Sequence, residues 1–316
     1  MVSKKLVAGA VAALALGGLA ACGGGGAGGN GESAGSSGTA TSADSPEVLT
    51  TFTILEDMTR TIAGDTLTVA SLTSPGTEIH GYEPSPQDAA KAEKAQLIIS
   101  NGLGLEHWVH KLTDNSPATK VEATTGIDPI NIAGTDTPNP HAWMSPDLAL
   151  IYVNNIVEAL SQLKPEHAET YKDNAKNYSR DIEQVRQELH QGLAALPDNQ
   201  RALVTCEGAF SYLAKDAHLK EGYIWPVNNE GDITSSQIRS AAEFVKDNHV
   251  PAVFCESTVE PGPKEQLIRD TGAADGGTLY VDSLSEASGP VPTYLDLLRY
   301  DARTIVEGLT THAHSH

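Results

Sequence analysis

Between Pro165 and Leu196 apolar residues recur at alternating steps of three and four, with charged residues between them. This spacing predicts one amphipathic helix, because it places the apolar side chains on a single face. Pro165 suits the first turn of a helix, and Pro197 would end it. At about 1.5 Å per residue this helix would span roughly 48 Å, more than the width of one small domain. We therefore expect it to join two lobes. The alternative, a dimeric coiled coil, is seldom flanked by two long α/β-patterned halves.

Short runs of β-forming residues alternate with helical segments on both sides of this helix. Ser85 followed by Pro86, and Thr234 followed three residues later by Gln237, have the spacing of helix N-termini. We predict an α/β fold of two parallel-sheet lobes, residues 47–164 and 197–316, joined by one long rigid helix, residues 165–196. The expected strands are residues 48–55, 66–72, 95–100, 202–206, 250–255 and 278–281. The expected helices include residues 147–163, 234–248, 263–271 and 293–309.

The N-terminus has the pattern of a secretory signal. Lys4 and Lys5 precede an apolar run that glycines interrupt, and small residues lead to Cys22. The run of about 16 residues is short for a bilayer core that needs roughly 20, which argues against a transmembrane helix. We expect residues 1–21 to be removed and Cys22 to be lipidated; the alternative is an ordinary signal peptide with an incidental cysteine. Residues 22–46, rich in Gly, Ala and Ser, would form a flexible tether.

Charge excludes one class of partner. The chain has 21 Lys and Arg residues against 41 Asp and Glu, a net charge of −20. Nucleic acid binding is excluded because it requires a basic surface. An acidic protein is also repelled by anionic lipid, so membrane attachment would depend on the lipid anchor. Beyond Cys22, the two remaining cysteines, Cys206 and Cys255, are candidates for one disulfide in an oxidising compartment.

Four candidate ligands lie where an open α/β sheet places its ligands, in loops just beyond the carboxyl ends of strands. They are His80, His141, Glu207 and Asp282. Two precede the long helix and two follow it, so a shared site would lie between the lobes. Two imidazoles and two carboxylates suit a divalent first-row metal, and the carboxylates would balance its charge. Each residue also has an ordinary explanation, such as an exposed loop histidine at His80 or a turn cap at Asp282.

Several segments, in this order, resemble the signatures of the metal-binding lipoproteins of bacterial ABC importers, the cluster A-I family. They are Pro75–Gly76 with His80 and Tyr82 to Pro86, Asn139 to Met144, Cys206 to Phe210, Phe254 to Ser257, and Val281 to Leu284. The resemblance covers nearly everything after the tether. It implies a C-clamp fold with the metal between the lobes, held by His80, His141, Glu207 and Asp282.

The resemblance also implies the cargo and the partners. Zinc-type members have a histidine as third ligand and a long His- and acid-rich loop, whereas this chain has Glu207 and lacks that loop. We therefore expect Mn(II), with Zn(II) or Fe(II) as alternatives. The protein would be an extracytoplasmic, lipid-anchored monomer that delivers the metal to an ABC permease and its ATPase and is no enzyme. Both histidines must be neutral to coordinate, so affinity should fall below about pH 6.

Several residues allow a second interpretation. Cys206 and Cys255 could be free buried thiols, although a disulfide closing a loop of about 50 residues is favoured outside the cytoplasm. His107 with His110, and the C-terminal His312, His314 and His316, could hold metal or could be ordinary polar surface. A metallohydrolase would need an open coordination position and a general base, and no His-Glu-x-x-His motif is present. A metal-dependent surface adhesin is a third class.

Overall fold

The computed structural model describes residues 46–114, 116–227 and 233–311. The expected signal peptide, Cys22, almost all of the tether and the C-terminal histidines lie outside these ranges. Within them, no helix has both the length and the apolar character that a membrane span requires.

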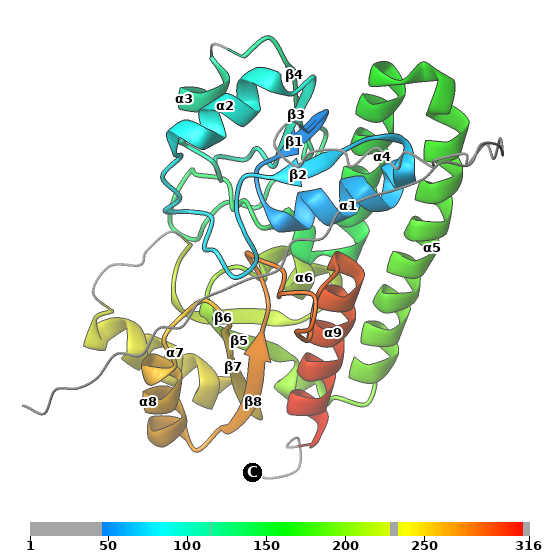
Figure 1. The fold of residues 1–316 in the computed structure, drawn as a ribbon. Helices are drawn as coiled ribbons and strands as arrows, with labels where there is room; N and C mark the ends of the chain where they lie inside the picture. Colours follow the sequence, from blue (N-terminus) through cyan, green and yellow to red (C-terminus); the bar gives the residue numbers. More distant parts are fainter. Residues whose placement is uncertain (1–45, 115, 228–232, 312–316) are drawn as a thin grey trace, which may run out of the picture. The chain divides into compact units, whose positions relative to one another are not determined.

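The first lobe is built on a parallel sheet of four strands in the order β2-β1-β3-β4 (Figure 1). Val48 lies opposite Val69 on one side and Leu97 on the other, so β1 is an interior strand. Its three residues are all buried, as expected for a strand covered on both faces. The elements of this lobe are β1 Val48–Thr50, α1 Thr53–Ala63, β2 Val69–Ser71, α2 Pro86–Lys94, β3 Leu97–Ser100, α3 Val109–Thr113, β4 Thr119–Glu122 and α4 Pro146–Leu163.

The predicted long helix is present as α5, Ala168–Leu193, preceded by a 3₁₀ turn, Pro165–His167. The 26 residues of α5 correspond to about 39 Å, shorter than expected because each end differs by three residues. Its apolar stripe is buried against α1, α4 and α9, and Figure 1 shows α4 and α9 beside it. The stripe consists of Tyr171, Ala175, Tyr178, Ile182, Val185, Leu189 and Leu193.

The second lobe contains two parallel strand pairs, β5 with β6 and β7 with β8. A disulfide between Cys206 and Cys255 joins β5 to β7, with the two Cα atoms 4.8 Å apart. The predicted disulfide is therefore present. The elements of this lobe are β5 Ala202–Glu207, α6 Ser211–Asp216, β6 Lys220–Trp225, α7 Ser235–Asp247, β7 Ala252–Glu256, α8 Gly262–Thr271, β8 Ala274–Leu279 and α9 Tyr294–Thr311.

Both predicted helix starts are confirmed. The Ser85 side chain accepts a hydrogen bond from the Asp88 backbone N–H while the Asp88 carboxylate accepts from the Ser85 N–H. Thr234 and Gln237 make the same reciprocal pair at the start of α7. Each pair satisfies two backbone donors that the first helical turn leaves without partners.

The first predicted strand, residues 48–55, is too long. The chain leaves β1 after Thr50 and α1 begins at Thr53, so Ile54 and Leu55 are buried on a helix. A short apolar run has the same appearance in either element, because burial on all sides removes the period that distinguishes them.

Asp57, on α1, accepts a hydrogen bond of 2.8 Å from the backbone N–H of Tyr294, the first residue of α9. Burial raises the pKa of Asp57 to about 6. A carboxyl group whose pKa is raised by folding destabilises the fold as pH rises from about 4 through 6. Asp57→Asn keeps an oxygen for Tyr294 and removes the charge. At pH 7.5 it should therefore stabilise the metal-free protein by about 1–3 kcal/mol.

Thermal melts at two pH values check this prediction. The melting temperature should rise at pH 7.5 by about 2–4 °C per kcal/mol, and the gain should shrink to a small fraction at pH 4. At that pH Asp57 is protonated in the folded state, and the solution pH is close to the ordinary pKa that Asp57 has in the unfolded state. An equal gain at both pH values would contradict an electrostatic origin.

Candidate metal centre

The fold brings the four candidate residues together from four separate loops and strand ends. His80 lies in the loop after β2, and His141 immediately precedes a 3₁₀ turn, Ala142–Met144. Glu207 is the last residue of β5, and Asp282 lies three residues after β8 ends. Each therefore follows a strand or begins a short turn, where a side chain can leave the sheet and point into the space between the lobes.

One ligand atom from each of the four residues lies within 4.8 Å of every other. The Nε2 atoms of His80 and His141 are 3.1 Å apart. Oδ1 of Asp282 is 3.8 Å from Nε2 of His80 and 3.4 Å from Nε2 of His141. His141 has no exposed surface and Glu207 is 6% exposed. The arrangement places two nitrogen and two oxygen donors close enough together to share one cation.

Asn139 fixes the tautomer of His141. Its Nδ2 donates to the carbonyl of Gly208 at 2.7 Å, so its Oδ1 must face the histidine. The backbone N–H of His141 donates to that Oδ1 at 3.1 Å, and Nδ1 lies 2.9 Å from it. Because Oδ1 can only accept, His141 carries its ring proton on Nδ1. The lone pair of Nε2 is then directed at the cluster, the arrangement typical of metal-binding histidines.

Hydrogen bonds also tie the loop of His80 to the loop of Asp282. The backbone N–H of Gly76 donates to Ser283 Oγ at 2.7 Å and to the Leu284 carbonyl at 3.1 Å. Within the first loop, the Glu78 carboxylate accepts from the backbone N–H of His80 at 2.5 Å. The two loops come from opposite lobes, so these bonds fix the position of a candidate ligand of one lobe relative to a candidate ligand of the other.

Trp143 covers the histidine side of the cluster. Its ring centroid lies 5.0 Å from that of His141 and 5.0 Å from that of Phe52. Its indole N–H donates to the Val281 carbonyl at 2.9 Å, next to Asp282. The side chain thus excludes water from one wall of the site and connects the lobes at the same time.

The electrostatics of the cluster favour a cation. Burial, followed by the charge of Glu207, raises the pKa of Glu256 well above its ordinary value. The Glu256 carboxylate also accepts from the backbone N–H of Glu207 at 3.2 Å. Burial lowers the pKa of His141 to about 4 and lowers that of His80. The imidazoles are therefore neutral near pH 7. The two candidate carboxylates, when both are ionised, would match the charge of one divalent ion.

The sequence identified the four candidate ligands, but it gave no sign of what Asn139 and Glu256 do. Both lie in segments quoted for the family resemblance, and each is almost fully buried. Their polar side chains would look like ordinary loop and strand-end residues, since only the fold reveals that they contact His141 and Glu207. Cys206 and Cys255, which lie close to Glu256, are bonded to each other and offer no thiolate to a metal.

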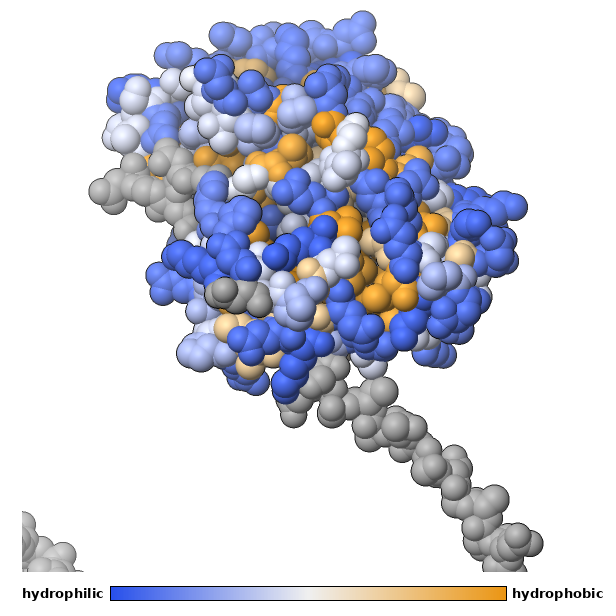
Figure 2. All heavy atoms as spheres, turned by 90° about the horizontal axis from the view of Figure 1, so that it is seen from above, coloured by the Kyte–Doolittle hydropathy of each residue, from blue (hydrophilic) through white to orange (hydrophobic). Residues whose placement is uncertain are grey.

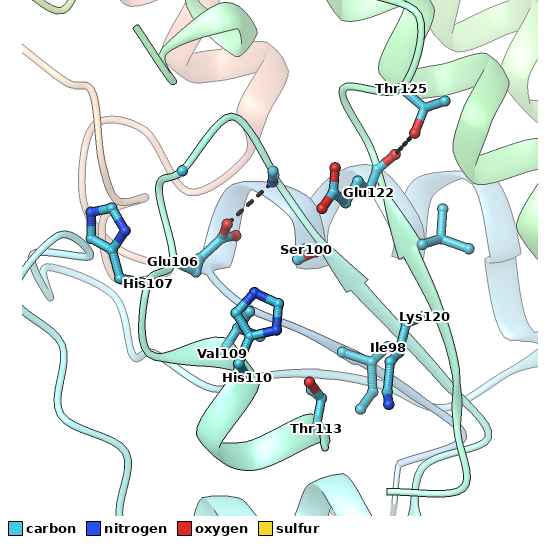
Figure 3. Close-up of a pocket in the computed structure, with 13 residues that line it drawn as sticks. Ile98, Ser100, Glu106, His107, Val109, His110, Thr113, Lys120, Glu122 and Thr125 are labelled. Carbon is cyan, nitrogen blue, oxygen red and sulfur yellow. Dashed lines mark hydrogen bonds between the residues drawn. The ribbon is translucent and has the colours of Figure 1, made fainter. Parts of the chain in front are cut away.

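His107 and His110 do not form a second cluster. They line a cavity of about 640 Å³ in the first lobe, together with Glu106 and Glu122. In Figure 3 the two imidazole rings lie apart, and Glu122 is on the far side of the cavity. Both oxygens of Glu106 are occupied by backbone N–H groups of Asn101 and Gly102. Among the described residues, no group of three or more His, Cys, Asp or Glu side chains close enough to hold a metal ion includes either histidine.

The known proteins that this chain resembles are all named for metal binding or metal uptake. The family model described as "Zinc-uptake complex component A periplasmic" matches residues 48–308. The iron-binding protein YfeA of Yersinia pestis is 46% identical over 266 residues, covering 83% of this chain and 86% of that protein. The manganese ABC transporter substrate-binding lipoprotein PsaA of Streptococcus anginosus is 31% identical over 281 residues, 85% of this chain and 91% of that protein.

A solved structure extends the match to the fold. The Mn-bound periplasmic metal-binding protein of Candidatus Liberibacter asiaticus superimposes with a TM-score of 0.79 at 40% identity. The match covers 83% of this chain and 98% of that one. The α/β fold with parallel sheets predicted from the sequence is thus confirmed. The chain belongs to this family of metal-binding, substrate-binding components of ABC metal uptake.

Proposed function

We propose that this protein captures Mn(II) outside the cytoplasm with His80, His141, Glu207 and Asp282 and delivers it to an ABC permease. The observation that carries the proposal is the convergence of these four donors, from both lobes, within 4.8 Å of one another. Members of the family bind cargo for a permease and its ATPase and are not enzymes, so no reaction is assigned to the site.

The donor set favours manganese over zinc as the physiological cargo. Carboxylates can bind through one or two oxygens, so Glu207 and Asp282 leave room for five or six ligand atoms. A histidine in place of Glu207 would shift the set towards nitrogen, which suits zinc better. The PsaA relative is named for manganese and the Liberibacter protein is Mn-bound, which supports the same choice.

Iron(II) is the second candidate cargo. The relative that shares 46% identity is named as an iron-binding protein, and Fe(II) accepts the same mixed nitrogen and oxygen ligands as Mn(II). Zn(II) stands above both in intrinsic affinity for such donors. We therefore expect zinc to bind in the test tube and metal availability to decide the cargo in the cell.

The proposal extends to the position of the protein at the membrane. Lipidation of Cys22 would hold the domain on the outer face of the membrane through a tether rich in Gly and Ser. We propose that it acts there as a monomer. On the face drawn in Figure 2, hydrophilic residues predominate and hydrophobic atoms reach the surface in separate groups.

Elemental analysis of protein purified without chelator, followed by competition titrations, tests the cargo. One equivalent of metal per chain is expected, with measurable binding of Mn(II), Fe(II) under anaerobic conditions and Zn(II), and with zinc the slowest to be removed. Absence of any Mn(II) binding would overturn the manganese assignment. Absence of binding by all three ions would overturn the proposed site.

The pH dependence of binding follows from the buried imidazoles. An ordinary histidine would begin to lose metal below about pH 6, but burial lowers the pKa of His141 to about 4. The neutral form that binds metal therefore persists to lower pH, and protons compete only as pH falls towards 4. We expect Mn(II) affinity to be nearly unchanged between pH 7 and pH 6 and to fall towards pH 4. Titrations in buffers of matched ionic strength measure it, and a tenfold loss by pH 6 would contradict it.

A further inference from the structure

A chain of hydrogen bonds runs from the metal centre to an acidic residue on β6. Nδ1–H of His141 donates to Asn139 Oδ1 at 2.9 Å. Nδ2 of Asn139 donates to the Gly208 carbonyl and also to Ser211 Oγ at 3.2 Å. The Ser211 hydroxyl donates in turn to Oε2 of Glu221 at 2.5 Å. The chain crosses from the first lobe to the second and ends on a carboxylate.

Every donor in this chain points the same way. The imidazole N–H, the amide N–H and the hydroxyl O–H are each directed towards Glu221, so the carboxylate polarises all three in one sense. A stronger acceptor at Nδ1–H makes the opposite nitrogen of an imidazole a better donor to a metal. The negative charge of Glu221, acting through Ser211 and Asn139, thus makes Nε2 of His141 a better electron-pair donor.

The surroundings of Glu221 allow this effect to be tested. Glu221, Ser211, Asn139 and Gly208 share the wall of a cavity of about 220 Å³. Burial raises the pKa of Glu221, and the hydrogen bond from Ser211 opposes that shift.

We propose that Glu221 is a positioning residue for the metal. Through Ser211 and Asn139 it holds the His141 imidazole with Nε2 turned to the cluster and raises the affinity of that nitrogen for the ion. The proposal rests on the proposed function, since it deepens the role of His141 in binding. The second lobe would then act on the metal in two ways. It supplies the carboxylates of Glu207 and Asp282, and through Glu221 it positions His141 of the first lobe.

The test is a double-mutant cycle with Mn(II) as the probe. Glu221→Gln keeps an oxygen for the Ser211 hydroxyl and removes the charge; Ser211→Ala interrupts the chain. Kd is measured at pH 8 by competition with a fluorescent chelator. Each single variant should weaken Mn(II) binding about tenfold, the lower end of the range for outer-shell partners. The double variant should be no weaker than Ser211→Ala alone, because residues in one network do not contribute additively.

Asp216→Asn is the matched control. Asp216 is a partly buried residue of the same lobe whose carboxylate accepts a hydrogen bond from the Ser145 hydroxyl. Ser145 is not part of the hydrogen-bonded chain that joins His141 to Glu221. It should leave Kd within about twofold, which separates transmission through the chain from the general attraction of any carboxylate for a cation. A loss at Asp216→Asn equal to that at Glu221→Gln would overturn the proposal.

A second readout follows the imidazole itself. In metal-free protein the Nδ1–H resonance of His141 should shift upfield in Glu221→Gln and in Ser211→Ala, since the hydrogen bond weakens, while thermal melts show that both variants fold. An unshifted resonance together with a wild-type Kd, or additive losses in the cycle, would refute the inference. Failure of the wild-type protein to bind any of the three metals would instead refute the proposed function.

Discussion

Replacement of Glu207 by alanine should weaken Mn(II) binding by more than about 100-fold. Loss of an outer-shell partner alone typically costs about 10–100-fold, and Glu207 is proposed to contact the ion directly. The variant would also remove one of the two ligand carboxylates that balance a dication. The remaining site would then bind with an uncompensated positive charge in a buried environment, which is strongly disfavoured.

The same variant should leave the metal-free fold intact. The charge of Glu207 contributes to the raised pKa of Glu256, and Asp282 adds to it, so the empty site holds carboxylates that repel one another. Removing Glu207 relieves part of that repulsion, and the melting temperature without metal should not fall. In wild type, Mn(II) at about 100 times Kd should add about 2.7 kcal/mol of stability. That gain should be lost in Glu207→Ala.

Thermal melts with and without Mn(II) therefore separate loss of a ligand from loss of structure. Glu243→Ala, an exposed acid on α7 of the same lobe, is the control and should keep both the affinity and the thermal gain. If Glu207→Ala bound Mn(II) as tightly as wild type, Glu207 would not be a ligand. A collapse of the melting temperature without metal would instead assign Glu207 a structural role.

The second large effect concerns the disulfide. Cys206 and Cys255 are 49 residues apart in sequence, and closing a loop of that length stabilises the folded state by about 4 kcal/mol in the chain-entropy model. Cys206→Ala combined with Cys255→Ala should therefore lower the free energy of unfolding by about that amount. Urea unfolding of the metal-free protein measures it, and the double variant serves better than reductant because it avoids thiol exchange.

The same disulfide should also affect metal binding. Cys206 immediately precedes Glu207, and Cys255 immediately precedes Glu256, whose carboxylate holds the Glu207 backbone N–H. Without the bond, the ends of β5 and β7 gain freedom beside a proposed ligand. We expect Mn(II) affinity to fall about tenfold at urea concentrations where the protein is still folded. Unchanged affinity would show that the bond stabilises the lobe without positioning the ligand.

The sequence predicted the fold where local chemistry and burial agree. Helices α2 and α7 begin at reciprocal caps, which their residue types predict. Helix α5 has an apolar stripe of seven buried residues. Strand β4, Thr119–Glu122, was not predicted because three of its four residues are exposed, which leaves no alternation to detect. Strand β6, Lys220–Trp225, was missed because a glycine and two charged residues obscure its pattern.

The candidate site could be predicted only as a set of ligand types. His80 and His141 attract attention because they stand in loops rich in Pro and Gly, and Glu207 because a carboxylate follows a buried strand. Their convergence depends on contacts between segments as far apart as Gly76 and Ser283. The partners of the ligands could not be foreseen, since Asn139, Ser211 and Glu221 become a chain only when the lobes meet.

If the site captures a metal ion as proposed, Trp143 affects how long that ion stays bound. Its indole lies against the fully buried His141 and donates a hydrogen bond to the Val281 carbonyl in the other lobe. An ion bound as proposed would therefore have no path to water past this side chain until the lobes separate. The time for which the ion stays bound would then depend on how fast Trp143 moves away from the site, as well as on the strength of coordination. A transporter that separates the lobes could unload even a tightly held ion quickly.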